Sequence, residues 1–313
     1  MIRQRPVELL APARNVECAM AAVDHGADAV YIGASRFGAR ASAGNSVEDI
    51  ARLVEYAHTF RVKVYVTVNT ILKDEELPET ERLVWALYRV GVDALIVQDM
   101  ALLELDLPPI PLHASTQMDN RTPEKVKFLH GLGFSQVVLA RELSLAEIQA
   151  VHEACDVPLE VFVHGALCVS YSGQCYVSQH CFGRSANRGE CAQFCRLKFD
   201  MVDSDGRMIE QGRHLLSLKD MNRGEDLERL LDAGVTSLKI EGRLKDVAYV
   251  KNVTAWYRSR LDEIFKRRPE YRRASSGQVS LAFTPCLEKS FNRGFTRYFL
   301  DGRTPDIFSF HTP

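Results

Sequence analysis

The chain repeats one pattern of polar and apolar positions: an amphipathic helical stretch, then a glycine, then a short run of consecutive apolar residues. The pattern is clearest at 25–33, 90–98, 132–140 and 233–241. Glycine is favoured just past a helix end because it tolerates the left-handed backbone conformation. Uninterrupted apolar runs are typical of parallel strands that are covered on both faces. The repeat therefore predicts helices that alternate with parallel strands.

Eight strand candidates can be counted along the chain. They are 7–11, 29–33, 63–69, 94–98, 112–116, 136–140, 159–164 and 237–241. Helical patterns lie between or after most of them, at 15–25, 46–59, 80–90, 122–132, 144–154, 225–233 and 247–265. Eight alternations of strand and helix predict an α/β fold of the (β/α)₈ TIM-barrel type, with an open doubly wound sheet as the alternative.

Two segments fall outside this repeat. Residues 165–223 form a long cysteine-rich insertion after the seventh predicted strand, and its stretch 203–206 predicts the tip of a β-hairpin. In a barrel this insertion lies at the carboxyl-terminal face, where active sites are built. We therefore predict a barrel over 1–265 that includes the insertion. Residues 266–313 are predicted to be a basic tail or the start of a further domain.

Composition and charge narrow the class of protein. The 313 residues are 46% hydrophobic and 26% charged, which is typical of a globular chain and excludes a disordered or collagen-like one. No membrane span or secretory signal is apparent, so we expect a cytoplasmic protein with no membrane partner. The net charge of -2 is unevenly divided, because residues 251–313 hold 12 Lys and Arg against 6 Asp and Glu. Such a segment can neutralise RNA phosphates, with a solvated helix end and loop as the alternative.

Five of the eight cysteines fall between residues 168 and 195. In a large cytoplasmic chain, such clustering indicates metal or redox chemistry rather than disulfides. Cys168, Cys175, Cys191 and Cys195 follow the spacing Cys-x₆-Cys-x₁₅-Cys-x₃-Cys. Four thiolates are the common ligands of an iron–sulfur cluster. Structural zinc prefers pairs of cysteines that are closer in sequence than Cys168 and Cys175. The spacing favours a cluster over zinc or no metal, with Cys181 as a spare ligand candidate.

The sequence around the first two of these cysteines resembles the signature of the collagenase-like peptidase family U32. The matching residues are Glu160, Phe162, Gly165, Ala166, Leu167, Cys168, Gly173, Cys175, Val177 and Ser178. Further stretches similar to this family are 9–15, 25–33, 37–40, 68–71, 113–117 and 239–243. The likeness therefore extends to about residue 260.

The resemblance implies a chemistry that the family name conceals. Members include enzymes that hydroxylate RNA bases and partners in oxygen-independent ubiquinone hydroxylation, and their cysteines bind a [4Fe–4S] cluster. Carried over, its ligands are Cys168, Cys175, Cys191 and Cys195. The chain is most similar to the branch that forms 5-hydroxycytidine in 23S ribosomal RNA. The near alternative is the branch that forms 5-hydroxyuridine at the tRNA wobble position.

The same resemblance implies further requirements. It implies a dependence on prephenate, ribosomal RNA or tRNA as the partner, and an electron donor for the cluster. Proteins of the ribosomal branch are longer than 313 residues, so we expect this chain to be an N-terminal fragment.

Polar residues near the predicted strand ends are the candidate substrate site. The candidate catalytic residues are His113, Gln117, His164 and Glu241, and the candidate clamps for phosphate or carboxylate groups are Arg36, Arg40, Arg141 and Arg243. The alternative roles are hydrogen bonding at the barrel mouth and helix capping for the strand-end residues, and ion pairing for the arginines. A peptidase is the alternative function, because His113, Ser115 and His164 could meet at the mouth. No serine-peptidase or zinc-peptidase motif supports it.

Overall fold

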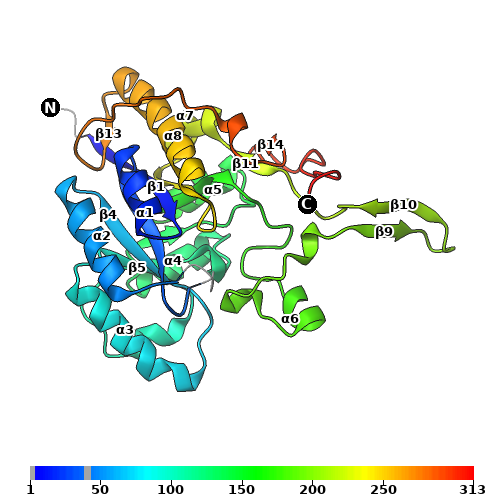
Figure 1. Ribbon diagram of the computed structural model, residues 1–313, viewed down its shortest axis with the longest axis horizontal. Helices are drawn as coiled ribbons and strands as arrows, with labels where there is room; N and C mark the ends of the chain where they lie inside the picture. Colours follow the sequence, from blue (N-terminus) through cyan, green and yellow to red (C-terminus); the bar gives the residue numbers. More distant parts are fainter. Residues whose placement is uncertain (1–3, 39–43) are drawn as a thin grey trace.

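Eight parallel strands close on themselves in the computed structural model, which describes residues 4–38 and 44–313 (Figure 1). They are β1 (Arg5–Ala13), β2 (Ala29–Ala34), β4 (Lys63–Val68), β5 (Ala94–Val97), β6 (Leu112–Ala114), β7 (Gln136–Val138), β8 (Leu159–Gly165) and β12 (Val235–Ile240). Each pairs with the next in this order, and β12 pairs with both β8 and β1. The predicted barrel is therefore confirmed, and the open sheet is excluded.

Seven helices follow the strands of the barrel. They are α1 (Val16–Asp24), α2 (Val47–Thr59), α3 (Leu77–Arg89), α4 (Pro123–Gly131), α5 (Leu145–Ala154), α7 (Leu227–Asp232) and α8 (Val247–Arg267). Ser46 and Asp49 close a capping box at the start of α2. Helix α3 begins three residues before its predicted start, with Pro78 in the first turn, where proline is well tolerated.

Continuous apolar strands are explained by burial on both faces. In β2, Val30 and Ile32 pack into the large core between strands and helices. The alternate residues Ala29 and Tyr31 join a second, smaller cluster that also contains Tyr65 and Ile96. Because successive strand side chains point to opposite faces, one run of apolar residues serves both layers.

The insertion after β8 passes over the barrel mouth. It contains the short helix α6 (Val177–Phe182), which the apolar pattern did not predict. A hairpin of β9 (Phe199–Val202) and β10 (Met208–Arg213) follows, as expected around 203–206, and projects away from the barrel (Figure 1). Strand β11 (Asp220–Asn222) then returns antiparallel to β8. Both ends of the insertion are thus anchored on one barrel strand.

The C-terminal segment, residues 251–313, packs against the rest of the barrel. Its strand β13 (Tyr271–Arg273) pairs with β1, and β14 (Phe295–Thr296) pairs with β11. Arginines of this region form ion pairs with acidic residues elsewhere, as in Arg258 and Arg273 with Asp28, Arg268 with Asp232, Arg293 with Asp220, and Arg297 with Asp226. Much of its positive charge is therefore neutralised within the fold. Across residues 4–38 and 44–313, no helix has both the length and the apolar character needed to span a membrane.

Candidate functional site at the barrel mouth

A cavity of about 280 Å³ lies where the insertion covers the carboxyl-terminal ends of the strands. Strand-end residues of the barrel form one side of it, including Tyr31, Thr67, Phe162, Lys239 and Glu241. The insertion forms the other side, which includes Cys168, Cys175, Cys191 and Cys195. The cavity therefore brings all four predicted cysteines to the place where barrel enzymes build their sites.

These four cysteines, here called the cysteine set, are free thiols that line one cavity. Burial raises the pKa of the Cys168 thiol, and the charges of Cys175 and Cys191 raise it further. Burial likewise raises the pKa of Cys195, and the other three sulfurs add to the effect. In the part of the chain that the structure describes, no three His, Cys, Asp or Glu side chains gather at one position for a single metal ion.

The loop that holds the first two cysteines is fixed from both sides. The buried Glu142 carboxylate accepts hydrogen bonds from the Ser172 amide at 3.0 Å and the Ser172 hydroxyl at 3.1 Å. Gly173 has a φ of +77°, and a Cβ built there would lie 2.0 Å from the Gln117 carbonyl oxygen. Only glycine allows this approach. The signature glycine therefore lets the loop rest on the barrel mouth.

Arg196 joins the second half of the cysteine set to the first. Its guanidinium donates to the Leu167 carbonyl at 2.7 Å, the Leu218 carbonyl at 2.9 Å and the Ser217 hydroxyl at 2.8 Å. Leu167 precedes the first cysteine of the set, and Arg196 follows the last. A single side chain thus fixes the two ends of the set relative to each other.

Arg188 docks the segment that carries the third cysteine. Its guanidinium contacts both Glu76 oxygens, at 2.7 and 2.9 Å, and the Ile71 carbonyl at 2.7 Å. The Ile71 amide donates to the Asn187 carbonyl at 3.1 Å. Arg188 lowers the pKa of Glu76 to about 2, so this carboxylate stays charged. The insertion is therefore attached to the connection between β4 and α3.

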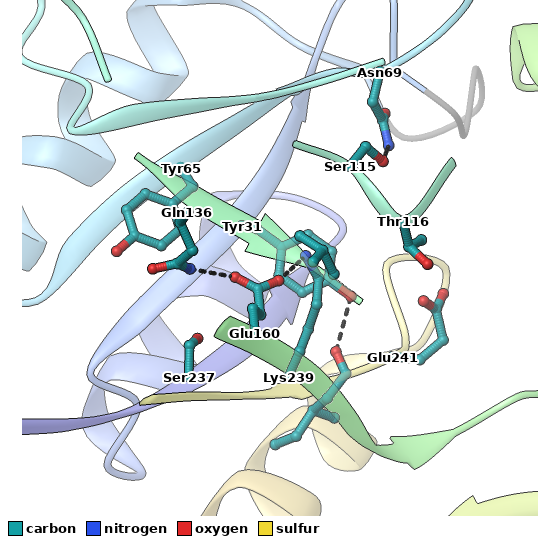
Figure 2. Close-up of polar contacts among 12 residues, drawn as sticks. Tyr31, Tyr65, Asn69, Ser115, Thr116, Gln136, Glu160, Ser237, Lys239 and Glu241 are labelled. Carbon is teal, nitrogen blue, oxygen red and sulfur yellow. Dashed lines mark hydrogen bonds and ion pairs between the residues drawn. The ribbon is translucent and has the colours of Figure 1, made fainter. Parts of the chain in front are cut away.

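Below the cavity, the barrel interior holds a polar network that the sequence analysis missed (Figure 2). Glu160 accepts hydrogen bonds from Lys239 and Gln136, each at 2.6 Å. A second buried carboxylate, Glu8, accepts from Tyr65 at 2.5 Å and from Ser237 at 2.7 Å. The sequence did carry a sign of this network. Glu160 in β8 and Lys239 in β12 are charged residues inside otherwise mostly apolar strands.

Two of the candidate arginines line the cavity. Arg141 pairs with Glu241 at 2.9 Å and lies 3.7 Å from the centre of the Phe162 ring. Arg243 donates to the Thr67 hydroxyl at 2.7 Å. With Lys239 they give the cavity three cationic side chains, which are held in fixed positions by their partners.

The other two candidate arginines lie elsewhere. Arg36 is largely exposed and pairs with Glu79 at 2.6 Å on the surface. Arg40 lies outside the described residues. Among the candidate catalytic residues, Gln117 and Glu241 line the cavity.

His113 lies inside the barrel, against Tyr65, with ring centroids 4.7 Å apart. Burial, and to a lesser extent the charges of Lys239 and Lys63, lowers its pKa to about 3. Its Nδ1 is buried, with no hydrogen-bond partner among the described residues. The predicted place of His113 at the mouth is therefore corrected to the barrel interior.

His164 is also displaced from its predicted position. The pairing of β8 with β12 shifts by one residue between Phe162 and His164. This irregularity reverses the alternation of side chains, so His164 packs against α8, 3.3 Å from the Tyr257 hydroxyl. Ser115 instead binds Asn69, at 3.2 Å (Figure 2). His113, Ser115 and His164, whose meeting at the mouth was the basis of the peptidase alternative, therefore do not come together.

We expect His113 to make folding sensitive to acid. Its pKa is about 3 in the folded protein, against an ordinary value near 6.5. Protonation therefore favours the unfolded chain, and stability falls as the pH drops from 6.5 towards 3. The loss is about 1.4 kcal/mol per pH unit. Urea unfolding between pH 6 and 4 should show a slope smaller by nearly that amount in His113→Phe. The exposed His130 provides the matched control, His130→Phe, and an unchanged slope in His113→Phe would contradict the prediction.

The fold and the site define a (β/α)₈ barrel protein with a cysteine-lined cavity at its mouth. The chain belongs to peptidase family U32, whose sequence model matches residues 14–308. It is 56% identical to the 23S rRNA 5-hydroxycytidine C2501 synthase of Escherichia coli, over 98% of this chain and 47% of that protein. It is 39% identical to tRNA hydroxylation protein P1 of Bacillus subtilis, over 84% of this chain and 64% of that protein.

A third relative carries a peptidase name. An uncharacterized protease of Methanocaldococcus jannaschii is 36% identical over 94% of this chain and 74% of that protein. The chain thus spans about half the length of the Escherichia coli relative and less than two thirds of the Bacillus subtilis one.

Proposed function

We propose that this chain is the barrel part of an RNA-base hydroxylase that forms 5-hydroxycytidine in 23S ribosomal RNA in the cytoplasm. The observation that carries the proposal is the 56% identity to the ribosomal enzyme of Escherichia coli along nearly the whole chain. Identity to the Bacillus subtilis tRNA protein is 39%. The ribosomal substrate is therefore favoured over the tRNA one.

The cysteine set is proposed to hold a [4Fe–4S] cluster. Four thiols line one side of a single cavity, and the other thiols of the set contribute to the raised pKa values of Cys168 and Cys195. Such a cluster takes four thiolates, each on a different iron, so its ligands need not meet at one point. When bound, it would supply one-electron chemistry beside the substrate. Dependence on prephenate and on an electron donor stays a prediction from the family resemblance.

The remaining lining residues suit a single base. The cavity of about 280 Å³ is near the small end of ligand pockets, so one extruded nucleotide fits better than folded RNA. Arg141 and Arg243 would hold polar or anionic groups at fixed positions, and Phe162 and Tyr31 would contact the base. The insertion would exclude water from the strand ends.

A peptidase receives less support from the site. Two relatives carry peptidase names, a protease at 36% identity and a collagenase of Porphyromonas gingivalis at 33%. However, the Ser115 hydroxyl contacts Asn69 rather than a histidine. A serine nucleophile needs an adjacent base, so this serine is not activated in the way that peptide hydrolysis requires.

Mass spectrometry of RNA nucleosides tests the proposal. A strain that lacks this protein should lose 5-hydroxycytidine from 23S ribosomal RNA, keep 5-hydroxyuridine in tRNA, and regain the ribosomal modification on complementation. Loss of the tRNA nucleoside alone would overturn the proposal in favour of the tRNA alternative. Unchanged nucleosides in both RNAs would overturn an RNA-modifying role altogether.

A further inference from the structure

Two exposed tyrosines lie at the rim of the cavity. Tyr171 is 50% exposed and Tyr176 is 56% exposed, and both line the cavity. They lie on the insertion beside Cys168 and Cys175. Exposed aromatic rings that flank a cavity, rather than being scattered over a surface, indicate a place where a flat ligand binds.

The loop that carries Tyr171 is held in place before any ligand arrives. It is fixed by Glu142 and by the close approach of Gly173 to the barrel, and the Gln174 amide donates to the Tyr171 carbonyl at 3.0 Å. The Arg121 guanidinium lies 4.1 Å from the ring centre. An ordered loop loses little conformational freedom on binding, which favours affinity.

Arg121 is itself oriented by an acidic neighbour. Two of its nitrogens contact the Asp119 carboxylate, at 2.5 and 2.9 Å. This pairing raises the pKa of Arg121, so the group beside the tyrosine stays cationic. Tyr171 therefore presents an accessible ring surface next to a permanent positive charge.

A second aromatic group with cations lies at the same end of the barrel. Phe291 is exposed, and its ring centre lies 4.4 Å from the Lys245 ammonium and 5.0 Å from the Arg293 guanidinium. Lys245 lies in the connection between β12 and α8, so this group is also at the carboxyl-terminal face. Aromatic rings interleaved with cations are the combination that binds single-stranded nucleic acid, through base stacking and phosphate contacts.

We propose that Tyr171 and Tyr176 form a stacking platform for unpaired bases of the RNA substrate, next to the nucleotide that enters the cavity. The inference rests on the proposed function and specifies its substrate as a single-stranded RNA segment. Bases in an A-form duplex are stacked on each other and do not offer their faces to tyrosine rings. Stacking accepts any base, so the platform contributes affinity rather than sequence choice.

Fluorescence anisotropy with a labelled, unstructured RNA of ten pyrimidines tests the platform. The unsubstituted 313-residue protein is compared with Y171A/Y176A and Y171F/Y176F. Loss of base stacking weakens binding by about 5- to 150-fold per base. The phenylalanine variant keeps both rings and should bind within about twofold of the unsubstituted protein. F128A, on the outer helix α4, removes a ring that is 58% exposed and is the matched control with unchanged affinity.

Two further measurements distinguish stacking from general damage. Iron content should be equal in all variants, because no ligand is changed. The slope of affinity against salt should also be equal, because phosphate contacts are untouched. Equal RNA affinity of Y171A/Y176A and the unsubstituted protein would overturn the platform alone. Failure of the unsubstituted protein to bind RNA would overturn the platform together with the RNA substrate proposed above.

Discussion

Replacing any one of Cys168, Cys175, Cys191 and Cys195 by serine is expected to remove iron binding and RNA hydroxylation together. Iron should fall from about four atoms per chain to a small fraction, because a serine hydroxyl is a hard, protonated ligand that does not substitute for a thiolate. The four thiols line one side of the same cavity, so the loss of one ligand affects the whole group. Anaerobic purification, iron and sulfide assays, and nucleoside analysis of complemented strains measure the two effects.

The chain offers matched controls for this substitution. Cys286 lies in the C-terminal segment, where its thiol contacts Glu288 at 3.2 Å, so Cys286→Ser should keep full iron and activity. Cys181 is exposed on α6 and tests the spare-ligand hypothesis, because Cys181→Ser should change iron content only if that thiol is a ligand. A Cys191→Ser protein that keeps its iron and modifies RNA would contradict the cluster assignment.

The barrel was predictable because its evidence is local. Eight apolar runs separated by helical patterns define the strands whatever lies elsewhere in the chain, and all eight were found in the predicted order. The grouping of the four cysteines at one cavity was predictable for a related reason, because they are close in sequence and chemically distinctive. The register irregularity near His164 was not predictable, because an extra residue in one strand leaves no mark on the apolar pattern.

Contacts between residues that are far apart in the sequence could not be predicted either. Glu160 and Lys239 are 79 residues apart, and they meet only because the closing strand of the barrel lies beside β8. The arginines of the C-terminal segment gave a surplus of positive charge in the sequence. Their acidic partners belong mostly to other parts of the chain, as Asp28 shows with Arg258 and Arg273. Local charge counts therefore overestimated the basic surface available to RNA.

Replacing Lys239 by methionine is expected to lower the free energy of unfolding by about 3–5 kcal/mol, because it leaves the buried Glu160 carboxylate without its cation. For a chain of this length the melting temperature should fall by roughly 5–8 °C, and calorimetry measures it. Lys219→Met is the matched control. Lys219 pairs with the exposed Asp306, and such surface pairs contribute at most about 1 kcal/mol.

Removing the charge of Glu160 and removing the charge of Lys239 should not have equal effects on stability. Burial lowers the pKa of Lys239, and this side chain lines the cavity, so in Glu160→Gln the lysine can lose its proton. In Lys239→Met the fully buried Glu160 carboxylate instead loses its cationic partner. We therefore expect Glu160→Gln to be less destabilising than Lys239→Met, and the double variant to recover part of the lost stability, because no unpaired charge remains. Equal melting temperatures for Lys239→Met and the unsubstituted protein would contradict the stabilising role of the Glu160–Lys239 pair.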